Sequence, residues 1–96
     1  MRPSEALPAH RDAIRQLVLE SGMMNPRIFG SVARGDDRDG SDLDMLVDLS
    51  YKTTPSDIGR VERRIAEATG LSVNLLVPKD LPPKFRDRVL SEAAPL

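Results

Sequence analysis

The sequence contains no cysteine and no tryptophan. Without cysteine the chain can form neither a disulfide framework nor a thiolate metal site, which is typical of a reducing compartment, and we expect a cytoplasmic location. The only aromatic residues are Phe29, Tyr51 and Phe85. Three aromatic rings are too few for a platform on which successive bases of a single strand could stack, so direct nucleic-acid binding is not expected.

Neither sign of charge predominates, because the sequence contains 14 lysines and arginines and 15 aspartates and glutamates. A general nucleic-acid-binding surface needs a basic excess, which is missing. No apolar run approaches the roughly 20 residues of a membrane span, and the N-terminus lacks the apolar region of a signal peptide. At 96 residues the chain is long enough for one modest core, so we expect a single domain over residues 1–96.

Hydrophobic periodicity and turn residues predict three helices and three strands. A helix from Ser4 or Pro8 to Ser21 precedes Gly22, and a second helix begins at Pro55 after Thr54 and ends before Gly70. The remaining elements are strands at 28–29, 42–49 and 71–77 and a helix over 82–94, with Phe85, Val89 and Ala93 on its apolar face. The first two strands are close in sequence and are expected to pair. The order α-β-β-α-β-α indicates an α/β (α+β) fold in two layers, a mixed sheet of three to four strands backed by helices.

Two closely spaced carboxylates begin the otherwise apolar strand "DLDMLVDL". Asp42 and Asp44 are two residues apart, so they project from the same face at a separation of roughly 6 to 7 Å. Two bare carboxylates at that distance repel each other unless a positive charge lies between them, and oxygen ligands without histidine or cysteine suit Mg²⁺ or Mn²⁺. The acids could instead protect an exposed strand edge from aggregation. The pair alone leaves both explanations open.

A small turn precedes the acids. Gly30 and Ser31 directly follow the apolar pair at 28–29 and could offer backbone N–H groups and a hydroxyl to phosphate oxygens. Gly-Ser alone is common in turns, so its weight comes from its distance to the acids. Arg34 could donate two hydrogen bonds to a phosphate, or it could pair with one of the neighbouring acids. Those acids are Asp36, Asp37 and Asp39.

The full stretch "GSVARGDDRDGSDLDMLV" resembles the signature of the minimal nucleotidyltransferases of the DNA polymerase beta superfamily. The resemblance rests on Gly30-Ser31, ten intervening residues and Asp42-x-Asp44. It includes Ala33-Arg34-Gly35 in the loop and Ser41 directly before the first acid. The helix before this stretch and the closing "PKFRDRVLSEAAPL" look like the usual flanks of the family, so the resemblance covers essentially the whole chain.

The resemblance implies a polymerase-beta-like fold and a magnesium- or manganese-dependent nucleotidyl transfer. Asp42 and Asp44 would be the catalytic acids and would hold the metal, and a hydroxyl would attack the α-phosphorus of ATP with pyrophosphate leaving. The nucleoside triphosphate would bind at Gly30, Ser31, Arg34 and Ser41.

One position departs from the family pattern. Members of the family generally bring a third acid from a neighbouring strand, and here Asn74 in "LSVNLLV" stands where that acid is expected. An amide oxygen can still reach a metal, but asparagine cannot act as a base near neutral pH. A partner could supply the acid, Asp48 or Asp80 could replace it, or the chain could bind without catalysis. Asp48 would lie about 13 Å from Asp44 along the strand, which is far for a shared metal.

The resemblance also implies a partner. Many small members, the MntA-like antitoxins, bind an all-helical HEPN ribonuclease toxin and transfer AMP from ATP to a tyrosine on it. A chain of this length has no helical domain to hold the base and the second substrate, so a partner would complete the cleft. The alternative is a catalytically weak or inactive module that neutralises its toxin by binding. Transfer to a small molecule is disfavoured because a second-substrate domain is missing, and self-association stays open.

Overall fold

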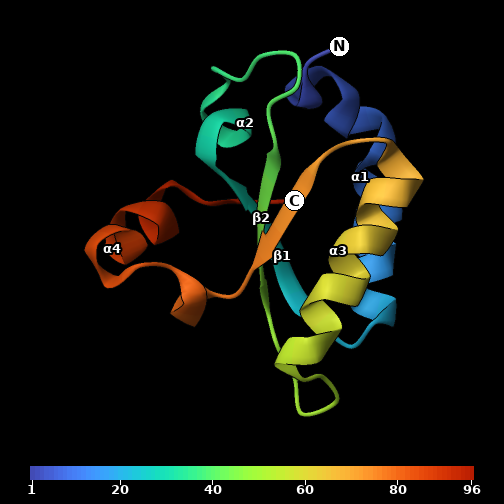
Figure 1. The fold of residues 1–96 in the computed structure, drawn as a ribbon, viewed down its shortest axis with the longest axis vertical. Coiled ribbons are helices and arrows are strands. Elements are labelled where there is room, and N and C mark those ends of the chain that lie inside the picture. Colours follow the sequence, from blue (N-terminus) through green and yellow to red (C-terminus); the bar gives the residue numbers. More distant parts are fainter.

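The computed structural model describes residues 1–96, and Figure 1 shows a central sheet with helices on both sides of it. The elements are α1 (Pro3–Glu20), β1 (Met24–Phe29), α2 (Gly30–Arg34), β2 (Leu43–Asp48), α3 (Pro55–Thr69), β3 (Val73–Leu76), a 3₁₀ turn η1 (Pro78–Asp80), α4 (Pro83–Glu92) and β4 (Ala94–Pro95). The predicted α/β class with a mixed sheet is confirmed.

The sheet has four strands in the order β3-β2-β1-β4. As predicted from their closeness in sequence, β1 and β2 pair, and they run antiparallel, with Phe29 opposite Asp44. β2 and β3 run parallel, which places Asn74 opposite Asp44. The C-terminal β4 pairs antiparallel with β1 and was not predicted. This register brings the end of β1 and the starts of β2 and β3 together at one end of the sheet, where Asp44 and Asn74 lie.

Helices cover both faces of the sheet, so the expectation of two layers was wrong (Figure 1). On one face α1 and α3 bury a large core that includes Ile14, Val18, Met45, Val61 and Ile65. On the other face α4 and the segment after β3 cover a smaller cluster of Phe29, Leu46 and Leu81. A central strand covered on both faces is expected to be apolar at nearly every position, and the partly exposed Asp44 and Asp48 are the exceptions within β2.

The best predicted element is α3. The Thr54 backbone N–H donates to the Asp57 carboxylate at 2.8 Å, which forms half of a capping box, and Pro55 occupies the first helical position. Gly70 ends the helix in the left-handed conformation with φ +73°. α1 begins at Pro3, one residue before Ser4, the first of the two starts predicted for it. Pro8, the second predicted start, lies inside the helix, where it lacks the N–H that a helix interior normally uses.

Two parts of the predicted element order need correction. The residues after β1 form a short helix, α2, between Gly30 and Gly35, where the sequence indicated only a turn. The last helix ends at Glu92 instead of 94, because Ala94 and Pro95 leave it to pair with β1. Of its predicted apolar face, Val89 and Ala93 pack against the smaller cluster, whereas Phe85 is 43% exposed.

Both edges of the sheet are short and partly blocked. On β3 the backbone N–H of Leu75 donates to the Glu62 carboxylate of α3 at 2.8 Å. On the opposite edge β4 has only two residues, one of which is Pro95. None of the helices combines the length and the apolar character that crossing a bilayer requires.

Candidate active site

The two predicted acids meet a third polar side chain at one end of the sheet. Asp42 directly precedes β2, and Asp44 is its second residue. The side-chain nitrogen of Asn74, on the adjacent β3, donates to Asp42 Oδ2 at 3.1 Å and to Asp44 Oδ1 at 3.0 Å. The parallel register of β2 and β3 therefore brings both carboxylates within hydrogen-bonding distance of a single atom.

The electrostatics of this pair favour a cation. Burial raises the pKa of the Asp44 carboxyl above its ordinary value, and repulsion from Asp42 raises it further, against a hydrogen bond from Asn74 that lowers it. A partly buried carboxylate next to a second one is costly in the ionised form. A divalent cation between the two would reverse that cost.

Gly30 passes directly over Asp44. A Cβ atom at residue 30 would clash with Asp44 Oδ2, and the backbone has φ +73°. Both the space and the backbone conformation therefore require glycine here. The start of α2 and the acid pair form one continuous site, as the spacing of the sequence motif predicts.

A glutamate from the C-terminal helix also reaches this site. Glu92 Oε1 accepts a hydrogen bond from the Gly30 backbone N–H at 2.8 Å and one from Arg34 at 3.0 Å. The Glu92 side chain is 20% exposed, so this contact is partly shielded from water. Sequence reasoning missed this residue, because Glu92 lies 62 positions after Gly30 and no local spacing connects them. A carboxylate thus occupies the donors that the motif assigns to a phosphate.

Of the two roles expected for Arg34, the structure shows the pairing with a neighbouring acid, and the contact with a phosphate stays a prediction. Its guanidinium pairs with Asp36 at 3.2 Å and with Glu92 at 3.0 Å. The other two acids of the loop turn elsewhere. Asp37 is buried and accepts the Ser4 backbone N–H at 2.8 Å, which fixes the loop to the start of α1. Asp39 pairs with the N-terminal amino group at 3.0 Å.

The remaining motif residues are the two serines. Ser31 is the second residue of α2, beside Gly30. The Ser41 hydroxyl accepts a hydrogen bond from the Arg38 backbone N–H at 2.9 Å. This contact closes the turn that leads into Asp42, so Ser41 shapes the approach to the first acid.

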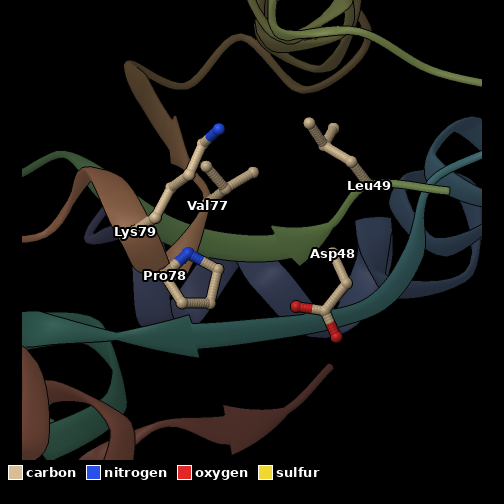
Figure 2. Close-up of a pocket in the computed structure, with 5 residues that line it drawn as sticks. All are labelled: Asp48, Leu49, Val77, Pro78 and Lys79. Atoms are coloured by element: carbon tan, nitrogen blue, oxygen red, sulfur yellow. The ribbon is translucent and has the colours of Figure 1, made fainter.

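The two aspartates considered as replacements for the third acid lie at the other end of the sheet. Asp48 is opposite Met24 at the start of β1 and forms an ion pair with Arg27 at 3.2 Å. It borders a separate cavity of about 350 Å³, and Figure 2 shows its carboxylate directed away from the side chains of Leu49 and Val77. Asp80 belongs to η1, beyond the C-terminal end of β3. Neither aspartate is placed to share a metal with Asp42 and Asp44.

The chemistry of the donor set fits a hard divalent cation. Two carboxylates converge on one point, and the Asn74 amide that now fills it carries an oxygen that could turn inward as a third ligand. No group of three acidic, histidine or cysteine side chains suited to a metal is found. The residues therefore fit Mg²⁺ or Mn²⁺ with two charged ligands and one neutral ligand.

Comparison with known proteins decides the family. The sequence profile described as "Polymerase beta, Nucleotidyltransferase" matches residues 26–96, nearly three quarters of the chain and all of the site. The chain belongs to this nucleotidyltransferase family. The matched region includes both acids, Gly30 and Asn74 as well as Glu92. The nucleotidyltransferase class predicted from the motif is thus confirmed.

Individual relatives of this nucleotidyltransferase agree. A protein of Methanocaldococcus jannaschii named "Putative protein adenylyltransferase MJ0435" is 32% identical over 77 residues, which are 80% of this chain and 83% of the relative. The solved structure "Structure of putative minimal nucleotidyltransferase" is 39% identical, with a TM-score of 0.84, and the match covers 97% of this chain and 95% of that one. The predicted minimal nucleotidyltransferase fold is confirmed.

More distant structures share the fold alone. "Crystal structure of the toxin-antitoxin with AMP-PNP" has a TM-score of 0.74 at 17% identity, and the match covers 88% of this chain and 69% of that one. "Crystal structure the toxin-antitoxin MntA-HepT" has a TM-score of 0.68 at 14% identity, with 92% and 69% covered.

Proposed function

We propose that this nucleotidyltransferase transfers AMP from ATP to a tyrosine hydroxyl on a partner toxin of the HEPN type, and so acts as its antitoxin. The proposal rests on the convergence of Asp42 and Asp44 on one point beside Gly30. It is supported by the relative named a protein adenylyltransferase, which covers most of both chains. The family resemblance and the distant toxin–antitoxin structures suggest the class of partner.

Asp42 and Asp44 would hold Mg²⁺ or Mn²⁺, with the Asn74 side chain turned to offer its oxygen. When bound, this metal would neutralise phosphate charge and stabilise the entering and leaving oxygens of an in-line displacement. The acceptor oxygen forms a bond to the α-phosphorus of ATP, the bond from that phosphorus to the bridging oxygen breaks, and pyrophosphate leaves. The hydroxyl proton passes to water or to a base of the partner, because Asn74 cannot accept it.

The chain's own residues bind and orient the triphosphate. Gly30 lies against Asp44, and Ser31 and Arg34 belong to the same short helix. The Gly30 N–H, the Ser31 hydroxyl and the Arg34 guanidinium would supply donors for the β- and γ-phosphates. Glu92 now accepts hydrogen bonds from two of these groups. Nucleotide binding therefore requires the Glu92 carboxylate to leave them, since a carboxylate and a phosphate cannot share the same donors.

A second function is favoured by Asn74 itself. Loss of the third acid leaves a fold that could still bind nucleotide and toxin while transferring nothing. If the missing group contributes even about 3 kcal/mol to the transition state, the rate falls by roughly 100-fold. In this case the chain neutralises the toxin by covering its active surface.

The experiment that separates the two functions is intact-protein mass spectrometry on the proposed partner, a HEPN-type toxin. The toxin is incubated with the chain, ATP and Mg²⁺, and in parallel with the Asp42→Asn, Asp44→Asn double variant. AMP additions that disappear with the variant are expected. A stable complex without any AMP addition would contradict transfer and would leave the binding function, for which the double variant should still neutralise the toxin.

A further inference from the structure

A cavity of about 360 Å³ opens beside the candidate active site, on the α4 side of the sheet. One end is polar and includes Gly30, Arg34 and Glu92. The rest of the lining is mainly apolar, with Phe85 two helical turns before Glu92 on α4, and it includes Phe29, Leu76, Leu81, Pro82 and Val89. A cavity of this volume lies in the range that small-molecule ligands occupy in proteins.

The apolar floor of this cavity is continuous with the acid pair. In the parallel register of β2 and β3, Asp44 lies opposite Asn74, and Leu46 lies opposite Leu76. Residues two apart on a strand share a face, so the two leucines follow the acid and the amide at a distance of about 7 Å on the same face. Leu46 is fully buried and Leu76 lines the cavity, so a ligand with its charged end at Asp44 would place its next part on Leu76.

The mouth of the cavity carries an exposed aromatic ring. Phe85 is 43% exposed, and the Arg88 guanidinium lies 5.7 Å from the centre of its ring. Arg88 lines the cavity as well. An aromatic face and an arginine plane are the groups on which proteins stack nucleobases without reading their sequence. Leu90 is exposed to a similar extent on the same helix, but it does not line the cavity.

We propose that this cavity binds the base of the nucleotide, with Phe85 as the stacking platform and Leu76 at the floor. This inference rests on the proposed function, which places the phosphates at the polar end. A nucleotide has the same order of parts as the cavity, with charge at one end and a flat, largely apolar ring at the other. The chain therefore holds the base with its own C-terminal helix, although its length suggested that a partner must do so.

The test compares two ligands that differ only in the nucleoside. Calorimetry with Mg²⁺ present gives the affinities of the wild-type chain, Phe85→Ala and Leu90→Ala for ATP and for inorganic tripolyphosphate. Phe85→Ala should weaken ATP binding by at least about fivefold, the lower end of what one base–aromatic contact contributes. Its affinity for tripolyphosphate and both affinities of Leu90→Ala should stay within about twofold of the wild type.

Each contrary result has a distinct meaning. ATP binding that Phe85→Ala leaves unchanged, or an equal loss for both ligands, overturns the base site while the proposed function stands. A wild-type chain that does not bind ATP at all overturns the proposed function and this inference with it. Should Phe85→Ala fail to fold, Phe85→Leu gives the same comparison. Adenosine without phosphate gives a second readout, because it should shift the methyl NMR signals of Leu76 and Val89.

Discussion

Replacing Asn74 with aspartate tests whether the acid pair forms a cation site. The Asn74 amide donates to both carboxylates, at 3.1 and 3.0 Å, so it partly compensates their charge. Asn74→Asp removes both hydrogen bonds and adds a third carboxylate of nearly the same shape. Without a metal, three like charges then share one corner of the sheet.

The expected cost follows from these contacts. Two unit charges about 4 Å apart repel by about 1 kcal/mol at the dielectric constant of water, which suits an exposed residue such as Asn74. Two such pairs give a loss of about 2 kcal/mol in the free energy of unfolding. For a domain of this size, that lowers Tm by about 10 °C.

Magnesium should reverse the effect. Three carboxylates bind a hard cation better than two, and ligand at a hundredfold excess over its Kd stabilises the folded state by about 2.7 kcal/mol. We therefore expect Asn74→Asp to melt well below the wild-type chain in EDTA and to show a larger rise in Tm than the wild type when Mg²⁺ is added. Differential scanning calorimetry with a Mg²⁺ titration measures both quantities.

The matched control is Asn74→Ala, which removes the amide without adding charge. It should melt between the other two chains in EDTA and respond weakly to Mg²⁺. If Asn74→Asp melts within about 2 °C of the wild type in EDTA and gains no more from Mg²⁺, then the three side chains do not converge as described, and the metal assignment is refuted.

Three other substitutions probe the surrounding contacts. Glu92→Gln removes the negative charge that competes for the phosphate donors, so titration calorimetry should show ATP binding several-fold more tightly, while Tm falls by only a few degrees because the glutamine oxygen can still accept both hydrogen bonds and an ion pair that is partly open to water contributes about 1 kcal/mol; weaker ATP binding would contradict the competition. Gly30→Ala places a Cβ against Asp44, so Mg²⁺ should no longer raise Tm; a wild-type response to Mg²⁺ would refute the close approach. Burial raises the pKa of the Asp48 carboxyl, but the hydrogen bonds from Arg27 and Asn25 and the positive charge of Arg27 lower it by more. The net pKa of Asp48 therefore lies below its ordinary value. The stability that Asp48 adds is therefore present above about pH 4 and lost as the pH falls through the lowered pKa, and Asp48→Asn should flatten the acid limb of the Tm profile; an unchanged slope would exclude this ion pair as its source.

The parts of the fold that were predicted correctly depend on local chemistry. The bounds of α3 follow from Thr54, Pro55 and Gly70, each of which has its effect within one helical turn. The apolar run of β2 marks a strand covered on both faces, which is also why Asp44 stands out in it. The two acids could also be found from local sequence, because residues two apart on a strand share a face.

The parts that were missed depend on contacts between distant residues. β4 consists of Ala94 and Pro95, and nothing in this pair favours a strand until β1 offers a free edge. α2 has five residues, too few for a helical period to be visible. Glu92 reaches Gly30 only because β4 anchors the end of α4 beside β1. Such residues can be placed only when the tertiary structure is known.

The blocked edges of the sheet restrict how the chain can meet other proteins. An open strand edge offers a row of backbone donors and acceptors to which a foreign strand can add. Here Glu62 already occupies the Leu75 amide on one side, and the two-residue β4 with Pro95 leaves little to pair with on the other. Extension of the sheet into a neighbouring molecule is therefore disfavoured, which reduces fibril-like assembly at high concentration. The toxin partner proposed above would therefore be recognised through side chains, on the helices and at the polar end of the sheet.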